Sequence, residues 1–254
     1  MSDRPNTSNS ALVELTDSLI RAGGCPLTHG GVPLVLLAGR VVWWERTATL
    51  LVADLHLGKV TAFAAGGLPM DAELGLRVAR ADLDRLGTLL AATAARRLII
   101  LGDLLHARGS RDAALFQVVG SWRQQWSHIE MLLIRGNHDE RAGDPPPDWA
   151  MPAVNEGIIE SGLELRHIPR QAGGRNAPAP AVPSVCGHLH PVVALADLPG
   201  CGSSRERTGC FALDAQTREL ILPAFGSFTG GARMAPRAGQ RLFVIAGQRV
   251  LPIA

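Results

Sequence analysis

The chain has 254 residues, of which 46% are apolar, 19% charged and 4% aromatic, and its formal net charge is +2. This composition excludes an intrinsically disordered protein, and no run approaches the ~20 consecutive apolar residues of a membrane-spanning helix. Four cysteines are too few for a disulfide scaffold at this length, so we expect a protein of the reducing cytoplasm without contact to a membrane.

The beginning of the chain is expected to form an N-terminal tail over residues 1–24, partly disordered, followed by a single domain over residues 25–254. Residues 1–10 are polar, and the apolar residues that follow are interrupted by Glu14 and Asp17. A domain of the remaining length can bury a large apolar core.

Two apolar runs near the start of the domain predict a β-hairpin at the edge of a sheet. They cover residues 33–38 and 40–44, and Gly39 separates them. Trp43 and Trp44 are adjacent, so only one of them is expected to face the core, because successive side chains of a strand point to opposite faces.

A repeating pattern of apolar segments follows the hairpin. The short runs 49–53, 98–101 and 131–134 predict buried strands, because glycine or polar residues end each of them. Between these runs, apolar residues recur at helical spacing within residues 71–95 and 112–126. This alternation predicts a βαβαβ unit with parallel strands.

The last part of the chain has a different pattern. Segments 163–167, 209–213, 219–223 and 241–245 are typical of strands, whereas no helical period stands out. Residues 169–183 are rich in proline and glycine, which predicts a long irregular loop. We therefore expect a second, more antiparallel sheet packed on the first.

Charge is distributed unevenly along the sequence. Residues 166–254 carry a balance of +6, whereas residues 1–165 carry −4. The basic part is suited to binding an anion, although arginines on solvated loops would give the same balance.

The predicted strands end in residues that can bind metal ions, at the sheet edge where α/β folds place their chemistry. The candidate ligands are Asp54, His56, Asp103, Asn137, His167, His188 and His190. The set contains no thiolate, which excludes a structural zinc site of the cysteine type. Its mixed oxygen and nitrogen donors favour Mn²⁺, Fe²⁺ or Zn²⁺ over Ca²⁺ or Mg²⁺.

The number of candidate ligands exceeds the coordination sphere of one ion. Two ions ~3.5–4 Å apart that share one carboxylate would use all of them. An isolated Asp-x-His or Gly-Asp is common by chance, but five such pieces in order, each after an apolar strand, are not.

The ordered motifs D-x-H, G-D, G-N-H-D, H and G-H-x-H resemble those of the calcineurin-like metallophosphoesterase superfamily. Longer blocks are similar to the bacterial ligase-associated DNA damage response metallophosphoesterases (the PdeM type). These blocks cover residues 54–59, 101–106, 135–139, 186–191 and 222–231. The resemblance implies an α/β fold, a four-layer α/β/β/α sandwich of two mixed sheets flanked by helices.

The same resemblance implies a phosphodiesterase or endonuclease that hydrolyses DNA with two divalent metal ions. Manganese is the expected metal, with Fe²⁺ or Zn²⁺ as alternatives. Single-stranded DNA or end and flap structures are the expected substrates. An ATP-dependent DNA ligase, a helicase and an exonuclease are the expected functional partners in DNA repair.

The superfamily pattern also assigns a role to each residue of the site. The first metal would be held by Asp54, His56, Asp103 and His190. The second would be held by Asp103, Asn137, His167 and His188, so that Asp103 bridges the two. His138 is not a ligand in this pattern: protonated, it would touch the leaving oxygen or a phosphoryl oxygen, while Asp139 would keep it charged. These two are the expected catalytic residues.

Further residues are candidates for contacts with the substrate. His106, Lys59 and Arg108 follow the ligand motifs and are expected at the rim of the site, with ordinary packing or surface charge as the alternative. Arg170 and Arg175 lie in the basic part of the chain and are expected to hold the DNA backbone.

Two other functions are compatible with parts of the pattern. A phosphatase or pyrophosphatase acting on a nucleotide or other small phosphoester would have the same metal ligands. A closed pocket would favour that reading, and a long cationic groove would favour a polymer. A non-catalytic scaffold is disfavoured, because no ligand of the pattern is missing.

Overall fold

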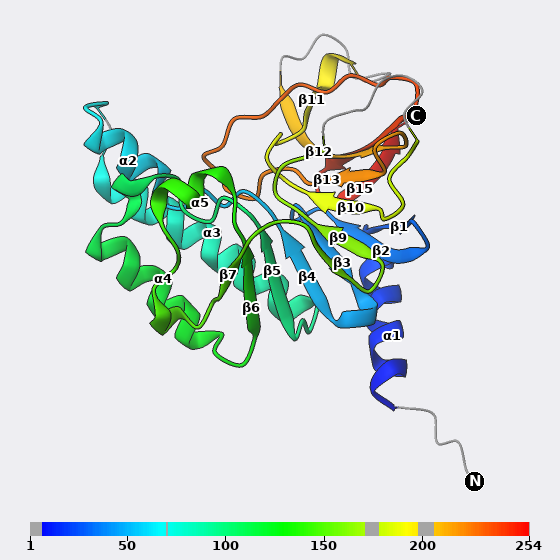
Figure 1. Ribbon diagram of the computed structural model, residues 1–254, viewed down its shortest axis with the longest axis horizontal. Helices are drawn as coiled ribbons and strands as arrows, with labels where there is room; N and C mark the ends of the chain where they lie inside the picture. Colours follow the sequence, from blue (N-terminus) through cyan, green and yellow to red (C-terminus); the bar gives the residue numbers. More distant parts are fainter. Residues whose placement is uncertain (1–6, 70, 171–177, 198–205, 254) are drawn as a thin grey trace.

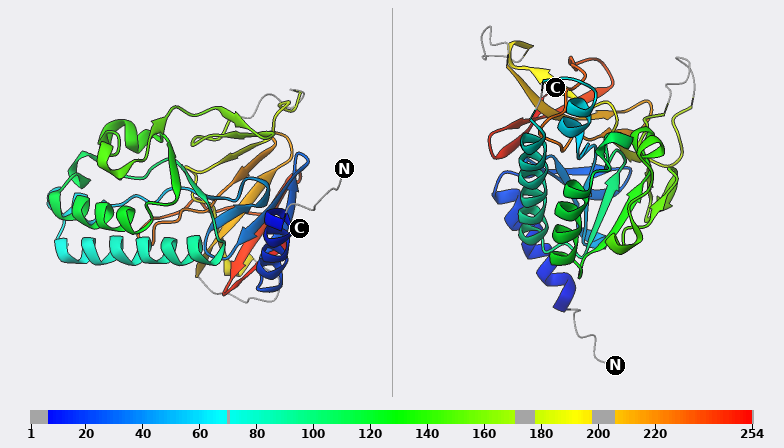
Figure 2. Two further views of the ribbon diagram at one scale, coloured as in Figure 1. Left: turned by 90° about the horizontal axis from the view of Figure 1, so that it is seen from below. Right: turned by 90° about the vertical axis from the view of Figure 1, so that its left-hand side faces the viewer.

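The computed structural model describes residues 7–69, 71–170, 178–197 and 206–253. In this part of the chain, two mixed β-sheets of seven and eight strands pack face to face and are flanked by helices (Figures 1 and 2). The expected α/β class with two mixed sheets is therefore confirmed. None of the described helices is both long enough and apolar enough to cross a membrane.

The first sheet has the strand order β1-β2-β3-β4-β5-β6-β7. Its strands are β1 (Cys25–His29), β2 (Val32–Leu37), β3 (Val41–Trp44), β4 (Thr49–Val52), β5 (Arg97–Leu101), β6 (Glu130–Ile134) and β7 (Ala153–Val154). The strands from β1 to β4 pair antiparallel, and those from β4 to β7 pair parallel. The predicted hairpin is β2-β3, but it is not at the edge, because β1 pairs with its outer side.

Helices α3 (Ala72–Ala92) and α4 (Ala113–Gln125) connect the parallel strands as predicted. They lie side by side on the outer face of the first sheet (Figure 2). Asp71 and Asp112 begin these helices, since their carboxylates accept hydrogen bonds from free backbone N–H groups of the first turn. The βαβαβ unit is therefore confirmed.

Shorter helices lie mostly in the connections. They are α2 (Lys59–Ala65), α5 (Asn137–Ala142) and the 3-10 turns η1 (Glu45–Thr47), η2 (Arg108–Ser110), η3 (Pro147–Trp149) and η4 (Leu195–Asp197).

The expected N-terminal tail is wrong for residues 7–21, which form helix α1 (Thr7–Arg21). Leu15 and Leu19, one helical turn apart, pack against the core layer that the first sheet forms with helices α3 and α4. Glu14 and Asp17, which interrupt the apolar run in the sequence, lie on the exposed side of the helix. A helix needs only one apolar side, so the two charges do not prevent it.

The second sheet has the order β15-β14-β12-β13-β10-β9-β8, and β11 pairs with β12. Its strands are β8 (Ile158–Glu160), β9 (Leu163–Leu165), β10 (Ser184–Cys186), β11 (Val192–Ala194), β12 (Arg207–Asp214), β13 (Glu219–Ile221), β14 (Gln240–Ala246) and β15 (Arg249–Ile253). Among the described strands of this second sheet, only the pairs β9-β10 and β10-β13 are parallel, which confirms that it is more antiparallel. Val193 and Met234 pack on its outer face.

Apolar side chains alternate between two layers of core. Leu50 of β4 faces the helices, whereas Leu51 faces the second sheet. Trp43 and Trp44 are both fully buried, contrary to expectation, because helices cover one face of β3 and the second sheet covers the other.

The two sheets place the ends of their parallel strands at a common edge. There, the chain after β13 joins the first sheet: Phe225 N donates to Ala53 O at 2.9 Å, and Gly226 N donates to Asp54 O at 3.0 Å. Segments far apart in the sequence are thus brought together beside the predicted ligands.

Candidate metal centre

The backbone is left-handed at most of the predicted ligands. The φ angles are 58° at Asp54, 47° at His56, 55° at Asp103, 72° at His188 and 49° at His190. Side chains other than glycine rarely adopt this conformation, which persists when the surrounding structure holds it in place. Each strand end therefore turns sharply and directs its side chain into a common space.

Two glycines leave the room that these side chains occupy. A Cβ atom at Gly102, whose φ is 82°, would overlap the His167 ring, and one at Gly136 would overlap the Asp103 carboxylate. The glycines of the Gly-Asp and Gly-Asn-His-Asp motifs are thus required by close approach.

One group of ligand atoms consists of Asp54, His56 and His190. His190 Nε2 lies 3.2 Å from Asp54 Oδ1 and 3.3 Å from His56 Nε2. His190 Nδ1 is 3.1 Å from the carbonyl oxygen of Gly230, to which it donates. This bond leaves a lone pair on Nε2, which is the arrangement that a metal-binding imidazole needs.

The second group consists of Asp103, His167 and His188, with Asn137 beside it. His167 Nε2 lies 3.4 Å from Asp103 Oδ1, 3.2 Å from His188 Nδ1 and 3.1 Å from Asn137 Oδ1. His167 Nδ1 donates to Leu101 O at 2.9 Å, which again leaves Nε2 for a cation. The structure therefore brings together all seven predicted ligands, in the division that the superfamily pattern assigns.

The donor atoms fit a divalent cation. Two nitrogens bound at ~2.1 Å to one ion lie roughly 3.0–3.4 Å apart. The His56–His190 and His167–His188 nitrogen pairs have this separation, at 3.3 and 3.2 Å. The ligand atoms of each group lie within 4.8 Å of one another.

Asp103 stands between the two groups. Its Oδ1 lies 3.4 Å from His167 Nε2, and its Oδ2 lies 3.6 Å from His56 Nε2. One carboxylate thus presents one oxygen to each group.

The pKa values of His167 and Asp103 reflect the negative charge that is buried at the site. Burial opposes a charge on His167, but its contact with Asp103 and the nearby Asp54 raise its pKa to about 9. Burial also opposes the charge of Asp103, yet the bond with His167 and neighbouring groups lower its pKa to about 2. The two carboxylates therefore create a place that stabilises positive charge.

Two other imidazoles of the site, those of His56 and His188, have lowered pKa values. Burial lowers the pKa of His56 to about 3, with nearby His190 and His138 acting in the same direction. Burial and His167 lower the pKa of His188. Neutral imidazoles are the form that binds metal ions.

Contrary to expectation, the Asp139 carboxylate does not contact the imidazole of His138. Its Oδ2 accepts hydrogen bonds from Asp103 N at 2.7 Å and Gly136 N at 2.9 Å, and its Oδ1 accepts one from Leu105 N at 3.2 Å. The carboxylate is engaged with the backbone because α5 turns it inward. It holds two ligand loops together, so we describe Asp139 as a positioning residue.

His138 is not part of the two ligand groups described above but forms a third cluster of possible ligand atoms with His56 and His106. Its Nδ1 donates to the carbonyl oxygen of His106, and its Nε2 is 4.0 Å from Asp103 Oδ2. The side chain is 28% exposed, so Nε2 can meet a substrate. This placement suits the predicted role as a proton donor.

His106 is half-buried and lies beside His56 and His138, and its contact with a substrate stays a prediction. Its Nδ1 is 3.3 Å from His56 Nδ1, and its ring stacks on His138 at 4.8 Å. Burial lowers its pKa to about 4, helped by the charge of His138. A neutral His106 can accept the Nδ1 proton of His56, which would direct His56 Nε2 toward the first group.

The two other predicted substrate contacts differ in position. Lys59 lies 5.8 Å from the centre of the Phe63 ring, and both line an open hollow with Phe228. Arg108 is exposed at the beginning of η2. Their contact with a substrate stays a prediction.

Arg170 is part of the fold instead of a free cation. Its guanidinium contacts the Glu164 carboxylate and donates to Val182 O at 3.0 Å and Thr217 O at 3.2 Å. These contacts compensate the charge of Arg170 within the chain, and its expected contact with DNA stays a prediction. Arg175 lies outside the described residues.

Sequence reasoning missed two groups that hold ligands in place. Glu156 Oε2 accepts hydrogen bonds from the backbone of His167 at 3.1 Å and Ile168 at 2.9 Å. The carbonyl oxygen of Gly230, within the block 222–231, accepts the hydrogen bond that orients His190. A lone glutamate and a backbone carbonyl give no local sequence signal.

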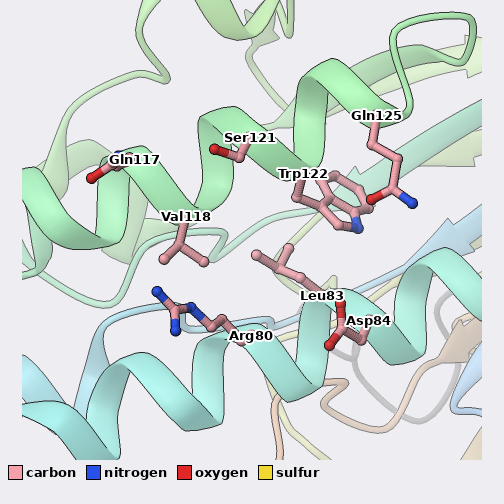
Figure 3. A pocket seen from close by; sticks show the side chains of 8 residues that line it. All are labelled: Arg80, Leu83, Asp84, Gln117, Val118, Ser121, Trp122 and Gln125. Atoms are coloured by element: carbon pink, nitrogen blue, oxygen red, sulfur yellow. The ribbon is translucent and has the colours of Figure 1, made fainter.

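A separate hollow of about 330 Å³ lies between α3 and α4 (Figure 3). Arg80 and Asp84 line it from α3, and Trp122 lines it from α4. None of its lining residues belongs to either ligand group, so it is not part of the metal centre.

An α/β sandwich whose parallel strands end in two such groups of ligands defines a metal-dependent phosphoester hydrolase. No protein-family model and no curated protein matches the sequence. The crystal structure of Pseudomonas putida nuclease MPE is similar, with 37% identity over 91% of this chain and 100% of that one and a TM-score of 0.73. The chain therefore belongs to the calcineurin-like metallophosphoesterase superfamily and is related to this nuclease. The E. coli phosphoesterase YfcE matches at 19% identity over 81% of this chain and 98% of that one, with a TM-score of 0.41.

The contacts of Asp139 predict the effect of Asp139→Asn. The amide keeps one acceptor oxygen and turns its NH₂ group toward backbone donors, so we expect the free energy of unfolding to fall by about 2–3 kcal/mol. Hydrolysis of bis(p-nitrophenyl) phosphate should fall as well, because Asp103 loses its support. Urea denaturation measures the first effect, with Glu140→Gln on the exposed side of α5 as the control. Wild-type stability of Asp139→Asn would contradict the positioning role.

The position of His138 predicts that His138→Ala keeps its metal ions. For a phosphodiester with an alkoxide leaving group, we expect the rate to fall by ~10²–10⁴-fold. The loss should be much smaller for a p-nitrophenyl ester, because that leaving group departs without a proton. Metal analysis and kinetics with both esters check this, with His128→Ala, an exposed histidine, as the control. Equal losses on both esters, or loss of metal, would show that His138 is not the acid.

Proposed function

We propose that this protein is a nuclease that hydrolyses phosphodiester bonds in DNA with two bound Mn²⁺ ions. The observation that carries the proposal is the position of Asp103, whose two oxygens face the two ligand groups. A carboxylate shared between two ions is the arrangement that two-metal phosphoryl hydrolysis uses. The likeness to a nuclease over nearly the whole chain supports the same conclusion.

The residues of the site would divide the reaction between them. Two bound cations would polarise the phosphoryl oxygens and lower the pKa of water. The two ligand groups would hold these ions beside the phosphate, and His138 Nε2 would give a proton to the leaving oxygen. His106 O keeps the His138 ring in place through Nδ1.

An open hollow of about 380 Å³ lies next to the ligand loops. It is lined by Lys59, Phe63 and Phe228, together with Gly230, whose carbonyl group orients His190. Phe228 is 41% exposed, and an exposed ring beside a cation is a surface on which an unpaired base can stack. These features favour single-stranded DNA or end and flap structures.

The proposed biological setting is DNA repair in the cytoplasm. An ATP-dependent DNA ligase, a helicase and an exonuclease are the proposed functional partners. The resemblance of the sequence blocks to ligase-associated metallophosphoesterases supports this setting.

The proposal is tested with the full-length protein and end-labelled single-stranded, duplex and hairpin DNA. With Mn²⁺ we expect cleavage of the single strand and of the unpaired part of the hairpin. EDTA and Asp103→Ala should each abolish it. A nucleotide, inorganic pyrophosphate and p-nitrophenyl phosphate serve as small substrates. If DNA is not cut with any divalent metal while a small substrate is hydrolysed, the protein is a phosphatase and the proposal fails.

A further inference from the structure

A positively charged cavity lies beside the metal centre and is not used by the site described above. It has a volume of about 220 Å³ and is lined by Arg40, Arg207 and His190 together with residues 223–224 and 229–231. No carboxylate of the described chain lines it. Because His190 also belongs to the first ligand group, the cavity and the metal centre share a side chain.

Arg40 is fixed in the turn between β2 and β3. Its φ angle is 65°, the residue is half-buried, and Nη1 donates to Ala224 O at 3.1 Å. Within the described residues, this is its one side-chain hydrogen bond, and no carboxylate oxygen lies within 4 Å of its guanidinium. Its other N–H groups are therefore available to a ligand.

The carboxylate that influences Arg40 is already engaged. Asp82 accepts hydrogen bonds from Arg85 Nη2 at 3.0 Å and from Ser227 N at 2.9 Å. Arg85 and Arg40 thus share the charge of one carboxylate, so one positive charge remains uncompensated at the cavity.

Arg207 supplies a second cation. It is exposed at the beginning of β12, and it has no ion pair within the part of the chain that the structure describes. Gly209 lies two residues along the same strand, where a Cβ atom would be 3.7 Å from Arg40 Nε. Residues two apart on a strand share a face, so both arginines lie at the same side of β12.

The chemistry of the cavity selects a phosphate group. Guanidinium groups match phosphate oxygens with paired hydrogen bonds, which a compact ammonium group does not do. A volume of about 220 Å³ is below that of pockets for whole drug-sized ligands and has room for a phosphate group.

We propose that Arg40 and Arg207 bind the phosphate next to the one being cleaved in a polynucleotide. This inference rests on the proposed function and adds a substrate-binding subsite to it. His190 lines the cavity and also belongs to the first ligand group, so a group bound in the cavity would lie next to the reacting phosphate. Only a substrate with a second phosphate reaches both places, so the cavity makes the enzyme prefer a chain of nucleotides.

The test uses the Mn²⁺-loaded protein and compares the dinucleotide TpT, which has one phosphate, with the trinucleotide TpTpT, which is one nucleotide longer and has two. For the wild type we expect kcat/KM to be about 10- to 100-fold higher for TpTpT than for TpT. This factor corresponds to the contribution of one hydrogen bond to a charged group. Arg207→Ala should remove most of this gain and leave TpT unchanged. Arg40→Lys, which keeps the charge and loses the paired donors, should remove part of it.

Salt provides a second readout on a longer single strand. The slope of log kcat/KM against log salt concentration should become shallower by about 0.7 for Arg207→Ala, as for one lost phosphate contact. Arg249→Ala, an exposed arginine on β15 that does not line the cavity, is the matched control and should change neither readout.

The outcomes separate this inference from the proposed function. If the wild type hydrolyses neither TpT nor any longer DNA, the proposed function fails, and the subsite fails with it. If the wild type cleaves DNA but gains nothing from the second phosphate, or if Arg207→Ala loses activity equally on TpT and TpTpT, the subsite is overturned while the nuclease stands.

Discussion

The structure depends on two fully buried carboxylates, Asp54 and Asp103, at the ends of neighbouring strands. Removing a carboxylate from water costs several kcal/mol unless other groups compensate its charge. Here backbone N–H groups of His188 and His138 compensate part of that charge, and the His167 ring compensates another part. The remaining compensation is suited to cations, because further imidazoles turn lone pairs toward the same space. The left-handed turns and the close-packed glycines at these strand ends allow the compensating groups to approach the two carboxylates.

Much of the fold and of the ligand set could be predicted from the sequence, because both depend on local patterns. Apolar runs followed by Asp54, Asp103 and Asn137 define strands and their ends without knowledge of the rest of the chain. Parallel strands then bring those ends to one edge. The two histidines of Gly-His-Leu-His are likewise fixed by a short motif after β10, and the structure assigns them to different ligand groups.

Other features could not be predicted, because they depend on what packs on a residue from elsewhere. Trp44 is buried only because a second sheet covers its strand. Asp139 supports the ligand loops because α5 turns its carboxylate toward backbone donors, and a motif does not show that direction. The engagement of Arg170 by Glu164 and two carbonyl groups likewise appears only in the fold. Arg40 and Arg207 are far apart in the sequence, so only the fold shows them in one cavity.

The most direct measurement is the anomalous scattering of manganese in crystals of the full-length protein grown with Mn²⁺. We expect two peaks of similar height. One should lie among Asp54, His56 and His190, the other among Asn137, His167 and His188, with Asp103 in contact with both. A single peak that saturates at one ion per chain would contradict the two-metal site, as would peaks outside these two groups.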